Sequence, residues 1–247
     1  MKLRIDVLTP FPQLVEAVVS TSILGRAATK GVVSYHLHSL FEFADAPHHK
    51  IDDEPYGGGA GMIMKPEPVF RAFDRVMEQV GPDAAPRVIF PTPDGKPFSQ
   101  ADAGTLAQAE HLVIICGHYK AVDQRVRDQL VTDEYSIGDF VVTGGELPAL
   151  LILDAVVRLQ EGVLSTRESA ETDSFGQSSN GLLDGPYYTR PREYRGLAVP
   201  DILLSGNHAE VKSWRQEQRR AQTRERRPDL WEQFQAAERQ VTEQENG

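Results

Sequence analysis

The sequence predicts an α/β domain with a mainly parallel sheet flanked by helices, followed by a small helical domain. Three short apolar runs, at 87–90, 112–116 and 137–142, are rich in β-branched or aromatic residues, and a loop containing glycine follows each one. Segments of helical character separate these runs, and strands that alternate with helices are typical of a parallel sheet. The composition changes after Gly162, where we expect the first domain to end.

Two helices are expected to flank the strands. Segment 99–110 begins with Ser99, and Asp102 follows three residues later, as in a capping box. Segment 146–160 has Pro148 in its first turn, where proline is tolerated, and then a nearly all-apolar body. Ligands bind such sheets at the carboxyl ends of the strands, so the three glycine loops are the expected site.

The second part of the chain has a different composition. Small and polar residues dominate 165–185, which predicts a flexible connection. Helices are expected at about 207–227 and 229–241, separated by Pro228. On the first of them, at about 100° per residue, four basic side chains fall within a sector of about 60°. They are Lys212, Arg215, Arg219 and Arg226. This basic stripe is either a solvated helix face or a surface that binds phosphates.

Charge and cysteine content restrict the possible functions. The 247 residues carry a net charge of −10, which taken alone argues against a nucleic-acid partner. Because of the basic stripe, RNA is still a possible partner.

The only cysteine, Cys116, excludes an intramolecular disulfide, and its position at the end of an apolar run predicts an inert core thiol. No run of about 18 apolar residues exists to span a bilayer, and the start lacks the apolar block of a signal peptide. We therefore expect a cytoplasmic protein with no membrane partner.

Two other patterns in the sequence do not predict a nucleotide-binding or metal-binding site. The glycine-rich stretch 56–61 lacks the Gly-Lys-Ser/Thr of a P-loop and the register of a dinucleotide fingerprint. We interpret it as a loop that another backbone or a ligand approaches closely. The four histidines at 36, 38, 48 and 49 have no cysteine among them and no HExxH spacing, so no metal site is predicted.

Several segments that occur in a fixed order are specific together. They are YGGGAGM at 56–62, CGHYKAVDQRV at 116–126, SIGDFVVTGGELP at 136–148, Asp173-Ser174-Phe175 with Gly181-Leu182-Leu183-Asp184, Tyr188-Thr189-Arg190-Pro191, and LSGNHAE at 204–210. With these segments the chain resembles the bacterial tRNA (guanine-N1-)-methyltransferases, the TrmD family, from residue 3 to about residue 230.

The resemblance implies a fold and a reaction. The fold would be a SPOUT α/β domain with a deep trefoil knot at 1–164, a flexible interdomain linker at 165–185 and a helical tRNA-binding domain at 186–247. The family works as a homodimer with the active site at the subunit interface. The reaction would move a methyl group from S-adenosylmethionine to N1 of guanosine at tRNA position 37, next to the anticodon. The alternatives are a related SPOUT methyltransferase with another RNA target and a non-catalytic RNA-binding module.

The resemblance also implies which residues bind the methyl donor. They would lie in the three glycine loops, where backbone groups bind the adenine and ribose and aromatic rings form the walls. The residues expected to bind the donor are Phe90, Pro91, Thr92, Gly117, Tyr119, Ile137, Gly138, Asp139, Phe140, Val141, Val142, Gly144, Gly145 and Pro148. Many family members have Gly-Arg-Tyr-Glu-Gly where this chain has GHYKA at 117–121, which reverses a charge beside the expected pocket.

Two residues match the family's catalytic positions. Asp173 would be the general base that removes the N1 proton. Arg158 would stabilise negative charge that develops on the guanine O6. From the residues alone, an ion pair of Arg158 with Asp154, four positions earlier on the same helix, is the other interpretation.

The expected RNA contacts lie in the last domain. Lys212, Arg215 and Arg219 would hold phosphates of the anticodon stem, which position the RNA without specifying its sequence. Ser205, Asn207 and His208 precede the stripe and would present polar groups to bases of the anticodon loop.

Overall fold

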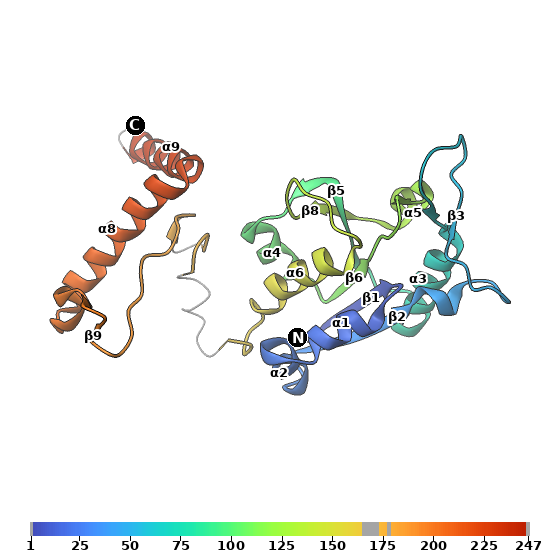
Figure 1. Cartoon of the computed structure of the whole chain (residues 1–247), viewed down its shortest axis with the longest axis horizontal. Helices are drawn as coiled ribbons and strands as arrows, with labels where there is room; N and C mark the ends of the chain where they lie inside the picture. Colours follow the sequence, from blue (N-terminus) through green and yellow to red (C-terminus); the bar gives the residue numbers. More distant parts are fainter. Residues whose placement is uncertain (1, 165–172, 177–178, 246–247) are drawn as a thin grey trace. The chain divides into compact units, whose positions relative to one another are not determined.

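The structure is a computed structural model that describes residues 2–164, 173–176 and 179–245 (Figure 1). The chain divides into two compact units, Met1–Ser165 and Thr166–Gly247. Parts of the expected linker, residues 165–172 and 177–178, lie outside the described residues.

The first unit is built on a five-stranded parallel sheet with the strand order β2-β1-β6-β5-β8. The strands are β1 (Leu3–Thr9), β2 (Val33–Ser39), β5 (Arg87–Pro97), β6 (His111–Ile115) and β8 (Asp133–Ser136). The middle strands β1 and β6 are almost entirely buried, as expected for a parallel sheet covered on both faces. The predicted fold class, a parallel sheet flanked by helices, is confirmed.

Helices cover both faces of this sheet and create two separate apolar cores (Figure 1). One core lies under α1 (Pro12–Val19), α2 (Ser22–Thr29), α4 (Gln100–Leu106) and α6 (Glu146–Val157). The other lies under α3 (Pro66–Val80), α5 (Gln124–Leu130) and the 3₁₀ turn η1 (Leu40–Phe43). Cys116 is fully buried in the first core, and burial raises the pKa of its thiol, so the prediction of an inert core cysteine is confirmed.

The helix signals in the sequence are largely confirmed. The side chain of Ser99 accepts a hydrogen bond from the Asp102 amide, and the Asp102 side chain accepts one from the Ser99 amide, which is the predicted capping box. The two predicted helices end a few residues earlier than expected, at Leu106 and Val157.

The third predicted strand is wrong. The strand β8 ends at Ser136, and the apolar run 137–142 forms a loop. Gly138 takes a φ of +139°, and its amide donates to the Ser136 hydroxyl at 3.2 Å, so the chain leaves the sheet at this point. Phe140 and Val141 are exposed. Their apolar side chains therefore serve a surface or a site and not the core.

A small three-stranded sheet, β3 (Asp52–Asp53), β4 (Ile63–Met64) and β7 (Ala121–Val122), carries the glycine-rich loop. Within the described part of the chain, no backbone approaches Gly57, Gly58 or Gly59, because a Cβ at any of them would meet no protein atom within 4 Å. At Gly61 a Cβ would lie 3.0 Å from the Cβ of Lys120, which is a side-chain neighbour, and the close approach of a ligand stays a prediction. The first three glycines serve the backbone conformation, since each has a positive φ.

The second unit contains the two predicted helices, α8 (His208–Arg226) and α9 (Pro228–Glu245). Pro228, expected between the helices, is instead the first residue of α9. Before them come the hairpin β9 (Glu193–Tyr194) and β10 (Leu197–Ala198) and the 3₁₀ turn η3 (Asp201–Leu204). Part of the expected linker packs on α8: the Leu183 amide donates to the Thr223 hydroxyl at 3.0 Å. Among the described residues, none of the helices is both long and apolar enough to cross a membrane.

A fully buried carboxylate, Asp6, ties three strands together. It accepts hydrogen bonds from Arg4 at 2.6 Å on its own strand, and its oxygens lie 2.7 Å from His38 Nε2 on β2 and 2.8 Å from His111 Nε2 on β6. Burial alone raises the pKa of Asp6, but the hydrogen bonds from His111, His38 and Arg4 outweigh burial and hold the pKa well below its usual range. Asp6 therefore stabilises the folded state only while it is ionised.

We expect Asp6→Asn to lower the free energy of unfolding by about 2–3 kcal/mol at pH 7, because it leaves buried donors without their charged acceptor. A carboxyl whose pKa is lower in the folded state contributes stability at neutral pH that is lost as the pH falls. Urea unfolding between about pH 7 and pH 2 should therefore show a steeper decline for the wild type than for Asp6→Asn. Parallel pH profiles would contradict this role, and Asp74→Asn at an exposed position of α3 is the control.

Candidate active site

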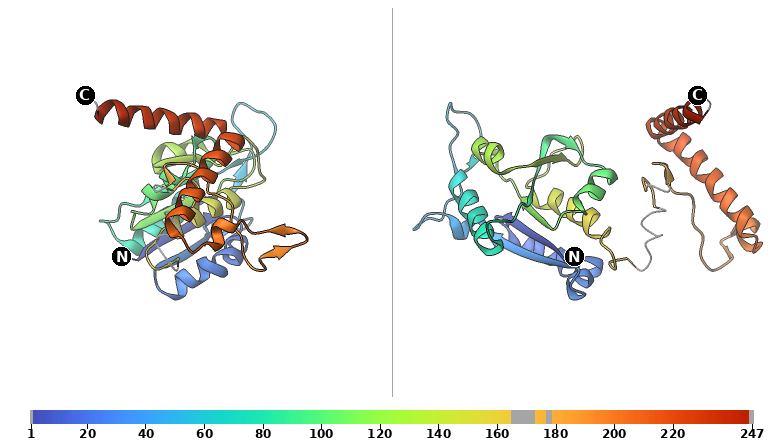
Figure 2. Two further views of the ribbon diagram at one scale, coloured as in Figure 1. Left: turned by 90° about the vertical axis from the view of Figure 1, so that its left-hand side faces the viewer. Right: turned by 180° about the vertical axis from the view of Figure 1, so that it is seen from behind.

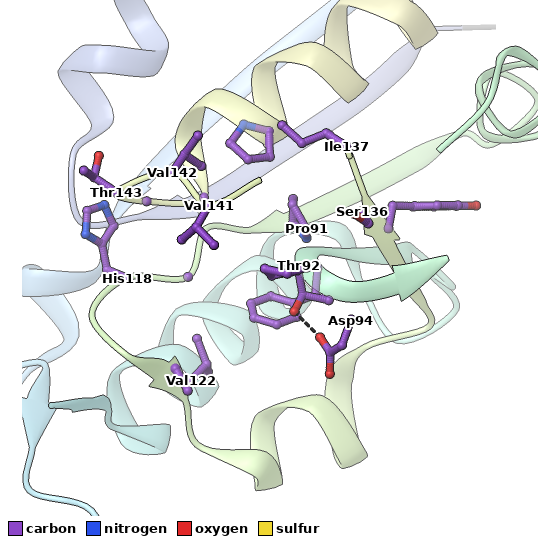
Figure 3. A pocket seen from close by; sticks show the side chains of 18 of the residues that line it. Pro91, Thr92, Asp94, His118, Val122, Ser136, Ile137, Val141, Val142 and Thr143 are labelled. Atoms are coloured by element: carbon purple, nitrogen blue, oxygen red, sulfur yellow. Dashed lines mark hydrogen bonds between the residues drawn. The ribbon is translucent and has the colours of Figure 1, made fainter. Parts of the chain in front are cut away.

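The residues of the three expected glycine loops meet around one cavity of about 390 Å³ (Figure 3). Two of these segments follow β6 and β8, whereas the first lies within β5, where the pairing with β8 shifts register between Pro91 and Lys96. The cavity has a volume in the range of small-molecule sites, and its position is the one that parallel sheets use for ligands. Except for Asp139, all the residues expected to bind the donor line the cavity: Phe90, Pro91, Thr92, Gly117, Tyr119, Ile137, Gly138, Phe140, Val141, Val142, Gly144, Gly145 and Pro148.

Main-chain contacts between glycines hold the loops together. The Gly145 amide donates to the Gly117 carbonyl at 2.7 Å, and a Cβ on Gly145 would lie 2.6 Å from the Gly117 nitrogen. The φ of Gly145 is −75°, which any residue adopts, so this position requires glycine for space alone. A Cβ on Gly144 would lie 2.1 Å from His118 Nε2, so this glycine too is required by a neighbour.

A buried carboxylate at the start of α6 supports the wall of the cavity. Glu146 accepts a hydrogen bond from the Thr9 hydroxyl at 2.6 Å, and its other oxygen lies 2.9 Å from His118 Nε2. Figure 3 shows His118 beside Thr143, in the part of the cavity wall near the start of α6. The edge of Phe11 packs on the imidazole, with ring centroids 5.1 Å apart. The side chain of His118 is therefore held by Glu146 of α6 and by Phe11 after β1. Thr9 of β1 holds Glu146 in turn.

A second ionic group fixes the part of β5 that lines the cavity. Arg127 on α5 donates to Glu134 at 2.7 Å and to Asp94 at 2.9 Å, and its guanidinium lies 5.6 Å from the centroid of the Phe90 ring. The Thr92 hydroxyl donates to Asp94 (Figure 3). The cavity wall formed by Phe90 and Thr92 is thus attached to α5 and β8.

Reasoning from the sequence does not find His118, Glu146 or Arg127 as site residues. His118 lies within the second glycine loop, and this position in the sequence could have indicated that it belongs to the site. Glu146 and Thr9 are 137 positions apart, and nothing local in the sequence indicates their hydrogen bond. Tyr119 is among the predicted residues, and the structure adds that burial and the nearby carboxylate of Asp52 raise the pKa of its phenol.

The two expected catalytic residues belong to different units. Arg158 follows the last residue of α6 in the first unit, where its amide donates to the Asp154 carbonyl at 3.1 Å. Asp173 is a half-buried residue of the second unit, and its carbonyl accepts a hydrogen bond from the Gly176 amide at 3.0 Å. Their catalytic roles stay predictions. Among the described residues, no group of histidine, cysteine, aspartate and glutamate side chains is arranged to hold a metal ion.

The expected RNA-binding residues lie before and along α8. Asn207 caps the helix by accepting a hydrogen bond from the Glu210 amide at 3.3 Å, His208 is the first residue of the helix, and Ser205 accepts from the Asn207 amide at 3.1 Å. Lys212 and Arg215 are exposed. Arg219 instead donates to Asp184 at 2.6 Å, and only 16% of its side chain is exposed. It therefore holds the segment before the hairpin to α8.

The fold and the cavity define a class: an α/β enzyme that binds a small ligand at the carboxyl ends of a parallel sheet and carries a separate helical unit with basic residues. Comparison with known proteins identifies the family. The chain matches the family described as tRNA (Guanine-1)-methyltransferase TrmD over residues 3–233, and it belongs to that family. The resemblance expected from the sequence is thereby confirmed, and with it the SPOUT class of the parallel sheet.

Relatives named tRNA (guanine-N(1)-)-methyltransferase are similar to the chain along nearly its whole length. The protein from Brevibacillus brevis is 52% identical over 230 residues, which cover 93% of this chain and 92% of the relative. The protein from Bacillus velezensis is 49% identical over 247 residues, which cover 99% of this chain and all of the relative. The protein from Listeria monocytogenes is 48% identical over 240 residues, covering 97% and 96%.

We expect Gly145→Ala to weaken binding of the methyl donor more than tenfold, because the added methyl group would separate the two loops that enclose the cavity. Isothermal titration calorimetry measures the affinity. The matched control is Gly104→Ala on α4, where a Cβ meets nothing within 4 Å and a gain in helix propensity is expected. Wild-type affinity in Gly145→Ala would show that the glycine contact does not shape the site.

Proposed function

We propose that this protein transfers a methyl group from S-adenosylmethionine to N1 of guanosine at position 37 of tRNA. The observation that carries the proposal is that the three glycine loops of a chain in this methyltransferase family converge on one cavity of suitable size. The relatives from the three bacteria are named for the same base and the same atom.

The residues around the cavity fit S-adenosylmethionine as the donor. Gly117, Gly144 and Gly145 line the cavity with main-chain atoms, and their protein neighbours leave little or no room for a Cβ at any of them. Phe90 and Phe140 supply aromatic surface for a flat base. The donor, when bound, supplies an electrophilic methyl group on a sulfonium.

The chain's own residues would handle the proton and the charge of the guanine. Asp173 would accept the N1 proton as the N1 electron pair forms the new bond to the methyl carbon, and the carbon–sulfur bond breaks with its electrons left on sulfur. Arg158 would donate to the guanine O6, where negative charge develops as the proton leaves. Each residue would therefore lower the barrier only when the substrate is in place.

We also propose a homodimer with the active site at the subunit interface. Its support is an exposed apolar face on the first unit, formed by Leu14 and Val18 of α1 and by Leu147 and Leu151 of α6, two helices that contact each other. In this proposed dimer, Asp173 of one copy would act at the cavity of the other, as the resemblance to the family implies. Family membership further supports a deep trefoil knot in the first domain, the boundaries at 164 and 185, and a cytoplasmic location where tRNA is available.

We expect Asp173→Asn to bind S-adenosylmethionine normally and to lose at least a hundredfold in methylation rate, because the amide is no base. The assay incubates a tRNA transcript with protein and donor and locates the methyl group by mass analysis. Asp74→Asn on α3, an exposed site outside the cavity, is the control.

Near-normal turnover in Asp173→Asn would exclude this residue as the base. A methyl group at another atom or nucleotide in the wild-type reaction would favour a related SPOUT activity, and RNA binding without transfer would favour the non-catalytic module.

We expect Lys212→Glu with Arg215→Glu to weaken tRNA binding and to reduce the salt dependence of the affinity by about one unit for each phosphate that the variant no longer binds. Both residues are exposed on α8, whereas a change at Arg219 would also break its ion pair with Asp184. Donor affinity should be unchanged. An unaltered tRNA affinity at low salt would contradict a role for the stripe, and Arg239→Glu on α9 is the control.

A further inference from the structure

Residues 187–198 of the second unit, here called the Tyr–Arg arm, expose an unusual set of side chains. Tyr187, Tyr188 and Tyr194 are 68%, 49% and 61% exposed, and Leu197 is 76% exposed. Three arginines of the same arm, at 190, 192 and 195, are exposed as well. In Figure 2 the hairpin β9–β10, in orange, projects away from α8. Large aromatic side chains kept on a surface in this way indicate a partner.

The arm is attached firmly at its two ends. At one end Tyr187 donates to Asp184 at 2.6 Å, and the same carboxylate accepts from Arg219 of α8. Farther along, the Val199 amide donates to the Arg192 carbonyl at 2.9 Å, and the Arg192 side chain donates to Asp201 at 3.0 Å. The exposed rings are therefore carried by an anchored segment, which lowers the entropy cost when a partner binds.

The tip of the hairpin has a strained residue. Tyr194 and Leu197 face each other across the two strands, and the two residues between them, Arg195 and Gly196, have φ values of +54° and +75°. Two-residue turns of this kind favour asparagine or glycine at both positions, because a Cβ is strained there. Arg195 occupies the first position, and its guanidinium lies 5.3 Å from the centroid of the Tyr194 ring. A strained arginine at an exposed tip points to a use for its side chain.

The chemistry of the arm selects the partner. The arm has three arginines against one acidic residue, Glu193, in a chain whose net charge is −10, so its charge favours an anionic partner. Tyrosine rings and guanidinium planes both stack on nucleobases, and arginine also binds phosphate. Unpaired nucleotides offer exposed base faces together with phosphates, whereas a duplex hides its base faces.

We propose that the Tyr–Arg arm is an RNA contact surface separate from the basic stripe of α8, where unpaired bases of the substrate stack on Tyr194 and Arg195 binds an adjacent phosphate. The inference rests on the proposed function and names a second part of the tRNA-binding site. It assigns the arm to the unpaired anticodon loop and leaves the stem phosphates to Lys212 and Arg215.

The test compares full-length variants for binding to two RNA probes: an anticodon stem-loop transcript, and a fully paired duplex with the same stem. Tyr194→Ala should bind the stem-loop about tenfold more weakly, since a base can no longer stack on the ring, and should bind the duplex as the wild type does. Tyr194→Phe, which keeps the ring, should retain wild-type affinity. Arg239→Ala on α9 controls for a general decrease in positive charge.

Arg195→Gly distinguishes a weaker interaction with RNA from a failure to fold. Glycine prefers the φ of this position, so the melting temperature should stay the same or rise. The slope of the logarithm of affinity against the logarithm of salt concentration should fall by about one.

Wild-type affinity for the stem-loop in both Tyr194→Ala and Arg195→Gly would overturn the inference, and the proposed function would stand if those variants still methylated tRNA. A change in oligomeric mass by analytical ultracentrifugation without a change in RNA affinity would also overturn it, because the arm would then contact a second copy. A wild-type protein that neither binds nor methylates tRNA would overturn the proposed function itself.

Discussion

The contact between the main chains of Gly145 and Gly117 is the constraint on which the cavity depends. Because β5 lies between β6 and β8, the loop after β8 has to pass the end of β5 to reach the loop after β6. It does so with a hydrogen bond of 2.7 Å and without room for any side chain. The space enclosed beneath this crossing is the cavity. Glu146 directly follows Gly145 and is held by Thr9, so the crossing is also fixed to β1, an inner strand of the sheet.

The sequence predicted well those features that local chemistry decides. Ser99 and Asp102 are three residues apart, and their capping box needs no distant partner. The apolar runs at 87–90 and 112–116 become strands because they are buried on both faces. The run at 137–142 has the same composition, yet its side chains line a cavity or face solvent. An apolar run in a sequence indicates side chains that favour contact with other apolar groups. It does not indicate whether those groups belong to the core or to a ligand.

The features that sequence reasoning missed are polar contacts between distant residues. Asp6 meets His38 and His111 through strand pairing, and Arg219 meets Asp184 where residues before the hairpin fold back on α8. The second of these changes the meaning of the basic stripe. The helical spacing places Arg219 beside its basic neighbours, but its guanidinium is paired with the Asp184 carboxylate. The cationic surface along α8 is therefore smaller than the spacing predicts.

The glycines of the cavity wall have a consequence for chemical inhibition. A compound that fills the cavity and rests against Gly117, Gly144 and Gly145 would contact positions where almost every substitution introduces atoms into occupied space. Substitutions that prevent the compound from binding would therefore have to occur at other positions. Phe140 and Val141 are examples, because their side chains are exposed and can change without disturbing the core. A compound that contacts the glycines and avoids the exposed loop would leave fewer positions at which a substitution could prevent its binding.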